Sequence, residues 1–187
     1  MAVSVGHLPL IFTFFVVCFS TNSIPVLSAT TELATKVCKS TTVFEFCRAV
    51  IYSDPRAPTA DRVALAYIAF GQAYTNTTKA ADQIASWIKP GDKDETQVGM
   101  KKCQLFYGWA AQAFREATGN MDSQVYGGLD RLAVMGEGYA RDCEASFSGQ
   151  PSPPLSEMNQ NLIKFSNICD AVSQLFPQDE NGDLVLV

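Results

Sequence analysis

Apolar residues recur at alternating steps of four and three along the segment 63–88. An α-helix brings residues three and four positions apart onto one face, so this spacing predicts one long amphipathic helix. Thr59 is the expected N-cap, with Asp61 in the first turn, and Pro90-Gly91 is expected to end the helix. The recurring residues are Val63, Tyr67, Phe70, Tyr74, Thr77, Ala81, Ile84 and Ile88.

Three later segments repeat the same spacing, and none shows a sustained β-type alternation. Four amphipathic helices joined by short loops predict an all-α fold, an antiparallel four-helix bundle over residues 59–176. Residues 31–52 are left over and are expected to form a shorter helical hairpin. The three further stripes are Cys103, Phe106, Ala110, Ala113 and Ala117; then Val125, Leu129, Leu132, Gly136, Tyr139 and Cys143; then Met158, Leu162, Phe165, Cys169, Val172 and Phe176.

The third stripe is rich in glycine, at positions 127, 128, 136 and 138. Each glycine inside a helix costs about 1 kcal/mol relative to alanine. Glycine at such positions either lets a neighbouring helix approach closely or makes the helix locally weak. The sequence leaves both interpretations open.

The N-terminus carries an apolar run of 12 residues, Leu8–Phe19. As a helix it would reach about 18 Å, too short for a hydrocarbon core of about 30 Å. Small residues follow at Ser28 and Ala29, so residues 1–28 are expected to be a secretory signal peptide; a buried N-terminal helix is the alternative. No other run is long enough to cross a membrane. We therefore expect a secreted domain at 29–176, followed by a tail at 177–187.

The charge and histidine content exclude several function classes. The net charge of −5 lies wholly after the predicted signal, and an acidic domain is a poor nucleic-acid binder. The one histidine, His7, lies within the predicted signal. A chain without histidine cannot use Ser-His or Cys-His catalysis or build a histidine-containing zinc site. We therefore expect a protein that is not an enzyme and that needs no metal or cofactor.

Five cysteines remain after the predicted signal, an odd number for an oxidising compartment. Cys103 lies near the start of the second stripe and Cys143 near the end of the third, and those two ends meet in an antiparallel pair. A bridge between them would contribute about 4 kcal/mol. Cys38 and Cys47 would close the short hairpin. Cys169, on the last apolar stripe, is expected to be a buried free thiol, with an intermolecular disulfide as the alternative.

Four short motifs follow one another along the chain: CKSTTVFEFC, DPRAPTADRVALA, RDCEASF and SNICDAV. In this order they resemble the motifs of the plant pectin methylesterase and invertase inhibitors, and the similarity runs from about Thr31 to Phe176. The resemblance implies a four-helix bundle with an N-terminal hairpin and the disulfides Cys38–Cys47 and Cys103–Cys143. It also implies a monomeric inhibitor that binds an apoplastic carbohydrate-active enzyme and blocks its substrate cleft.

The resemblance favours pectin methylesterase as the target. Invertase inhibitors of this family can carry a Pro-Lys-Phe motif between the second and third bundle helices, and residues 119–126 lack it. The segment after Cys143 is more similar to pectin methylesterase inhibitors. Inhibition of acid invertase in wall or vacuole is the alternative. Two further hypotheses are a carrier whose bundle encloses an apolar ligand and a domain that has lost inhibitory activity.

The partner-binding surface is expected on the helix that begins at the third cysteine of the mature chain. Similar pectin methylesterase inhibitors place carboxylates there, and the matching positions are Leu105, Trp109 and Gln112. Leu105 and Trp109 lie one turn apart off the core stripe, which predicts an apolar docking patch unless the hairpin or a loop covers it. Asp130 and Asp142 are the expected acidic contacts.

Asn76-Thr77-Thr78 is an N-glycosylation sequon. Thr77 falls on the first apolar stripe, so Asn76 is expected to face outward.

Overall fold

The computed structural model describes residues 26–147 and 153–177, and this part of the chain contains only helices, turns and loops. The predicted tail, apart from Pro177, and all but the last three residues of the predicted signal peptide lie outside the described residues. No helix among the described residues is long and apolar enough to cross a membrane. The elements are α1 (Val26–Ser40), α2 (Phe44–Ile51), the 3₁₀ turn η1 (Ala57–Thr59), α3 (Arg62–Trp87), α4 (Glu95–Asp122), α5 (Leu129–Ala145) and α6 (Ser156–Ser173).

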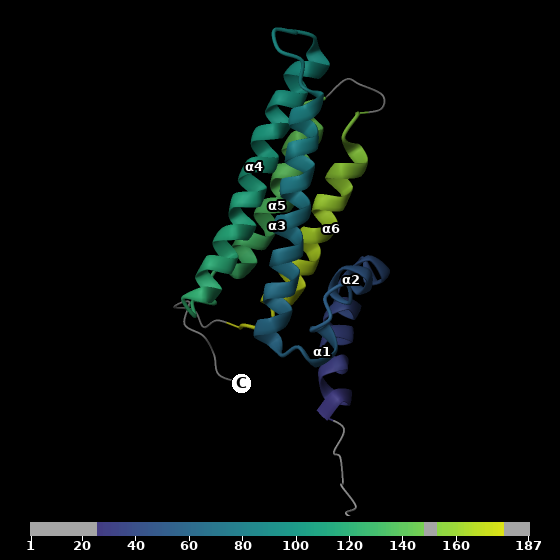
Figure 1. Cartoon of the computed structure of the whole chain (residues 1–187), viewed down its shortest axis with the longest axis vertical. Helices are drawn as coiled ribbons and strands as arrows, with labels where there is room; N and C mark the ends of the chain where they lie inside the picture. Colours follow the sequence, from purple (N-terminus) through teal and green to yellow (C-terminus); the bar gives the residue numbers. More distant parts are fainter. Residues whose placement is uncertain (1–25, 148–152, 178–187) are drawn as a thin grey trace, which may run out of the picture.

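Helices α3 to α6 form an antiparallel bundle in which each packs against the next and α6 returns to α3 (Figure 1). The apolar stripes meet along the bundle axis, where side chains such as Phe70 and Phe114 are completely buried and their rings meet edge to face, with centroids 6.3 Å apart. The predicted all-α four-helix bundle is confirmed.

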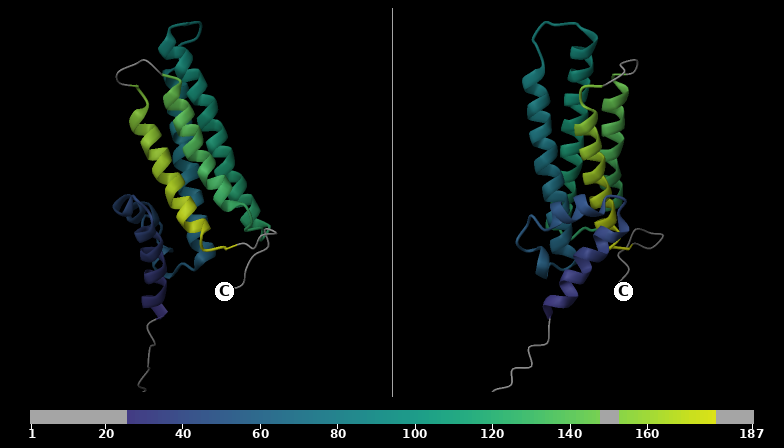
Figure 2. Two further views of the ribbon diagram at one scale, coloured as in Figure 1. Left: turned by 180° about the vertical axis from the view of Figure 1, so that it is seen from behind. Right: turned by 90° about the vertical axis from the view of Figure 1, so that its right-hand side faces the viewer.

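Helices α1 and α2 form the predicted hairpin, which lies beside one end of the bundle against α3 and α6 (Figure 2). The Cys38–Cys47 disulfide closes it, with the two Cα atoms 5.4 Å apart. Phe46 of α2 meets Phe165 of α6 edge to face, with ring centroids 5.2 Å apart. Ile51 is fully buried, so the hairpin shares the core of the bundle.

The first bundle helix begins two residues later than the predicted N-cap requires. Asp61, not Thr59, is the N-cap, and its carboxylate accepts a hydrogen bond from the backbone N–H of Ala64 at 2.8 Å. The prediction was wrong because the chain forms the 3₁₀ turn η1 first, and Ala60 is extended between that turn and the helix. Aspartate at this position also carries the negative charge that a helix N-terminus favours.

Helix α5 also starts later than its stripe suggests. Val125, the first residue of that stripe, is 51% exposed and precedes the helix. Its backbone N–H donates to the carbonyl of Asn120 at 2.8 Å and so closes the end of α4. Gly128, immediately before α5, has φ of +77°, a conformation that glycine adopts without strain. The apolar spacing therefore continued by coincidence through a turn.

Gly136 marks a close approach between three helices. A Cβ at this position would lie 2.5 Å from Cζ of Phe114 on α4 and would also collide with Oγ of Ser166 on α6. Gly138, two residues later, is exposed and would have nothing within 4 Å of an added Cβ. Of the two interpretations of the glycine-rich helix, close packing therefore holds at Gly136 and not at Gly138.

We expect Gly136→Ala to lower the free energy of unfolding by about 1–3 kcal/mol, because the added methyl overpacks the contact with Phe114. Gly138→Ala is the matched control, and we expect it to raise stability by about 0.5–1 kcal/mol through helix propensity alone. Urea unfolding followed by circular dichroism measures both. Equal effects of the two substitutions would contradict the close-packing interpretation.

Candidate functional site

One face of helix α4 exposes large apolar side chains to solvent. Val98, Leu105 and Trp109 are 43%, 58% and 50% exposed, respectively. Since successive helical residues are about 100° apart, Lys102 and Gln112 lie on the same side of the helix, and both are exposed. We call these five residues the α4 stripe. Apolar side chains repeated along one exposed helix face indicate an interaction surface.

Trp109 is the centre of an aromatic cluster that joins α4 to α5. Its ring centroid lies 5.6 Å from that of Phe106 on α4 and 5.8 Å from that of Tyr139 on α5. The rings of Phe106 and Tyr139 stack at 6.4 Å, and both side chains are half-buried. Trp109 is therefore supported by two rings while half of its surface stays exposed. An anchor held in this way loses little conformational freedom when a partner binds.

The hairpin does not cover this aromatic cluster. It packs against α3 and α6, whereas Trp109 and Tyr139 lie on α4 and α5, the other two helices of the bundle (Figure 2). Among the described residues, Trp109 keeps half of its surface open.

The two predicted acidic contacts lie in different places. Asp142 is exposed and follows Tyr139 by three residues, so it lies on the side of α5 that borders the aromatic cluster. Asp130 precedes it by 12 residues, about 18 Å along the helix and a third of a turn around it. Helix geometry thus places Asp142 on the side of α5 that borders Trp109, and Asp130 a third of a turn away from that side.

Sequence reasoning missed Phe106 and Tyr139 as parts of this surface, because both lie on apolar stripes that indicate core. They occupy the edges of those stripes, where helix α4 meets helix α5, and are only partly buried. An aromatic residue at the edge of a stripe, three residues from an exposed tryptophan, is the signal that could have identified Phe106.

The second disulfide fixes the helices beside the cluster. Cys103 and Cys143 are joined with Cα atoms 4.7 Å apart, and Phe106 and Tyr139 lie one turn from them. Both predicted disulfides are therefore present. The bridge holds α4 against α5 at the point where the aromatic cluster is built.

The titratable groups near the bundle core form structural contacts. Tyr107 donates to Oδ1 of Asn159 at 3.0 Å, and Asn159 donates from Nδ2 to a carboxylate oxygen of Glu144 at 2.5 Å. Burial raises the pKa of Tyr107, with a smaller effect from the charge of Glu144. This network joins α4, α6 and α5. No group of three or more histidine, cysteine, aspartate or glutamate side chains in the described ranges could hold a metal ion.

Comparison with known proteins identifies the family. The sequence model of the family described as plant invertase/pectin methylesterase inhibitor matches residues 32–172. The chain belongs to this family. An Arabidopsis thaliana relative, "Cell wall / vacuolar inhibitor of fructosidase 2", is 31% identical over 150 residues, which cover 78% of this chain and 82% of the relative. A second relative from the same plant, "Pectinesterase inhibitor 5", is 27% identical over 137 residues, covering 71% and 76%.

Solved structures of inhibitors in this family share the fold. A mutant form of a pectin methylesterase inhibitor from Arabidopsis superposes with a TM-score of 0.66 at 16% identity, covering 78% of this chain and 98% of that one. A pectin methylesterase inhibitor from Arabidopsis thaliana gives 0.58 at 17% identity, covering 79% and 98%. At this identity the likeness shows the fold alone.

Cys169, the predicted free thiol of this family member, is unpaired and completely buried in α6. Burial raises the pKa of the thiol well above its usual range, and the charge of Asp170 adds to the effect. Because the thiolate is the reactive form, we expect iodoacetamide at pH 8 to leave Cys169 unlabelled in the folded protein and to label it in guanidinium. Peptide mass spectrometry measures this. Rapid labelling of Cys169 in the native state, or a dimer that a reductant converts to monomer, would contradict this expectation.

Proposed function

We propose that this protein is a secreted, monomeric, non-catalytic inhibitor that binds a carbohydrate-active enzyme of the wall or vacuole stoichiometrically. The surface formed by the α4 stripe, Tyr139 and Asp142 covers the substrate cleft of that enzyme. The observation that carries the proposal is the half-exposed Trp109, supported by the rings of Phe106 and Tyr139 on two disulfide-linked helices. Interfaces concentrate binding energy in a few such aromatic anchors.

The shape of the surface suits exclusion of a substrate. Helix α4 has 28 residues, and at about 1.5 Å per residue it is about 42 Å long. A rigid rod of this length can lie across a sugar-binding cleft and prevent substrate from entering. This mechanism needs no nucleophile, metal or cofactor in the inhibitor. Leu105 and Trp109 supply the apolar contact, and Asp142 supplies a charge beside it.

Acid invertase, a β-fructofuranosidase, is the first candidate target. The fructosidase inhibitor relative is 31% identical to this chain, whereas the pectinesterase inhibitor relative is 27% identical over a shorter match. The α4 stripe agrees with this order. It carries Leu105, Trp109 and Gln112 where carboxylates would be expected for docking on pectin methylesterase.

Pectin methylesterase, the target favoured by the sequence, is the second candidate. Two features of the sequence support it: the resemblance of the segment from Cys143 to Val172 to pectin methylesterase inhibitors, and the absence of Pro-Lys-Phe between α4 and α5.

Titration of a fixed amount of each enzyme with the protein tests the function and separates the two targets. We expect the activity of invertase, the first candidate, to fall linearly with added inhibitor until one inhibitor is present per enzyme molecule. Because the α4 stripe is mainly apolar, we expect the inhibition constant to change only about threefold between 0.05 and 0.5 M NaCl. If only pectin methylesterase were inhibited, the order of the two targets would be reversed. If the protein inhibited none of several isoforms of either enzyme, the proposed function would be overturned.

A further inference from the structure

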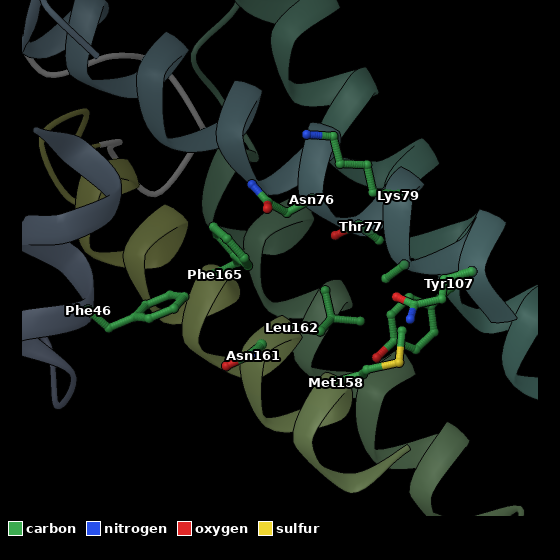
Figure 3. Close-up of a pocket in the computed structure, with 11 residues that line it drawn as sticks. Phe46, Asn76, Thr77, Lys79, Tyr107, Met158, Asn161, Leu162 and Phe165 are labelled. Carbon is green, nitrogen blue, oxygen red and sulfur yellow. The ribbon is translucent and has the colours of Figure 1, made fainter. Parts of the chain in front are cut away.

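A pocket of about 330 Å³ opens between helix α2 and the groove that α3 and α6 form (Figure 3). Pockets that hold small organic molecules begin at about this size. It faces the hairpin, so it lies away from the α4–α5 surface described above. Apolar side chains from four helices form most of its wall: Phe46, Ala80, Tyr107, Met158, Leu162 and Phe165.

The charges around the pocket are positive. Lys79 is the only charged residue among the 11 that line it, in a chain of net charge −5. Lys164 does not line the pocket but contacts two residues that do: its Nζ is 5.3 Å from the centroid of the Phe46 ring and donates to Oδ1 of Asn161 at 3.2 Å. None of the described residues that line the pocket carries a carboxylate. A site with cations and no carboxylates favours an anion.

Thr77 adds a buried donor to the pocket wall. Its side chain is only 2% exposed and lines the pocket (Figure 3). Among the described residues, its Oγ1 has no hydrogen-bond partner. Leaving a buried hydroxyl unpaired costs about 1–3 kcal/mol, whereas valine would fill the same space without that cost. A threonine on an otherwise apolar stripe, at the wall of a pocket, points to a ligand atom that accepts its hydrogen bond.

We propose that this pocket binds a small amphipathic monocarboxylic acid. The apolar body of the acid packs between Phe46, Leu162 and Phe165. In the proposed complex the Thr77 hydroxyl donates to the carboxylate, and the Lys79 side chain, which is exposed in the free protein, turns inward to pair with it. Aliphatic and aromatic acids share this chemistry. The site differs from a carrier cavity inside the bundle, because the bundle axis is filled by fully buried side chains such as Phe70 and Phe114.

The predicted glycosylation site borders the same pocket. Asn76 is half-buried, lines the pocket, and donates from Nδ2 to the carbonyl of Gln72 at 2.8 Å. A glycan on that nitrogen would stand at the pocket mouth and compete with the acid. The protein for the test is therefore produced without a glycan, with both disulfides formed.

Calorimetric titration with three probes tests the proposal: decanoate, ferulate and the uncharged decanol. We expect at least one acid to bind at a one-to-one ratio and to raise the melting temperature, with decanol at least about tenfold weaker. Binding of decanoate alone identifies an aliphatic acid, and binding of ferulate alone an aromatic one. No saturable binding of either acid, or equal binding of decanol, would overturn the proposal.

Variants place the binding in this pocket. We expect Lys79→Ala to weaken acid binding about tenfold and Thr77→Val about fivefold, with the folded state of Thr77→Val at least as stable as the parent. Ala80→Trp fills the pocket and should abolish binding, while the exposed Lys93→Ala, outside the pocket lining, should not change it. Unchanged binding in Ala80→Trp would overturn the site. No target enzyme is present, so this outcome is independent of the proposed inhibition.

Discussion

Replacing Trp109 by alanine is expected to weaken inhibition at least about 30-fold while leaving the fold intact. Trp109 is 50% exposed and touches only the edge of the core, so its loss leaves the bundle axis filled. Truncation of a central aromatic anchor costs an interface about 2–4 kcal/mol, which corresponds to a loss of about 30- to 1,000-fold in affinity. The inhibition constant against the target enzyme measures the loss, and circular dichroism confirms the fold.

The chain offers a matched control in its other tryptophan. Trp87 is 41% exposed but ends helix α3, off the α4–α5 surface. We expect Trp87→Ala to inhibit as well as the parent protein. An equal loss of inhibition in Trp87→Ala and Trp109→Ala would show that the α4 stripe is not the contact surface. The same result would leave the family assignment untouched, because that rests on the whole sequence.

The fold was predictable because its main signals are local. A helix places residues three and four apart on one face whatever surrounds it, so the four stripes could be found without knowledge of their partners. Helix ends were less predictable, because turns next to a helix compete with it for the same residues. The 3₁₀ turn at Ala57–Thr59 displaced the expected cap to Asp61, and the left-handed Gly128 separated Val125 from helix α5.

The candidate site was predictable only in part, for a reason of packing geometry. Leu105 and Trp109 stood out because they are large apolar residues that lie outside the apolar stripe of their own helix. Tyr139 did not stand out, because its contact with Trp109 depends on which face of α5 packs against α4. The sequence pattern of one helix does not determine how two helices pack. The pocket beside Thr77 also escaped prediction, since it arises where the hairpin meets two helices of the bundle.

Removing the disulfide between α4 and α5 is expected to have the largest effect on stability. The Cys103–Cys143 bridge spans 40 residues, and loop-closure entropy assigns it about 4 kcal/mol; the Cys38–Cys47 bridge spans 9 residues and is assigned about 2.5 kcal/mol. Double replacement by alanine at each pair measures the two effects. All four cysteines are completely buried, so the two double replacements leave similar small cavities. The difference between the two losses of stability therefore measures the difference in loop-closure entropy.

The two double variants should also differ in function. Cys103 and Cys143 lie one turn from Phe106 and Tyr139, so their loss loosens the support of Trp109 even at temperatures where the bundle stays folded. We therefore expect weaker inhibition from Cys103→Ala/Cys143→Ala and unchanged inhibition from Cys38→Ala/Cys47→Ala, each measured well below its melting temperature. If the hairpin variant lost inhibition and the bundle variant kept it, the contact surface would have to lie on α1 and α2.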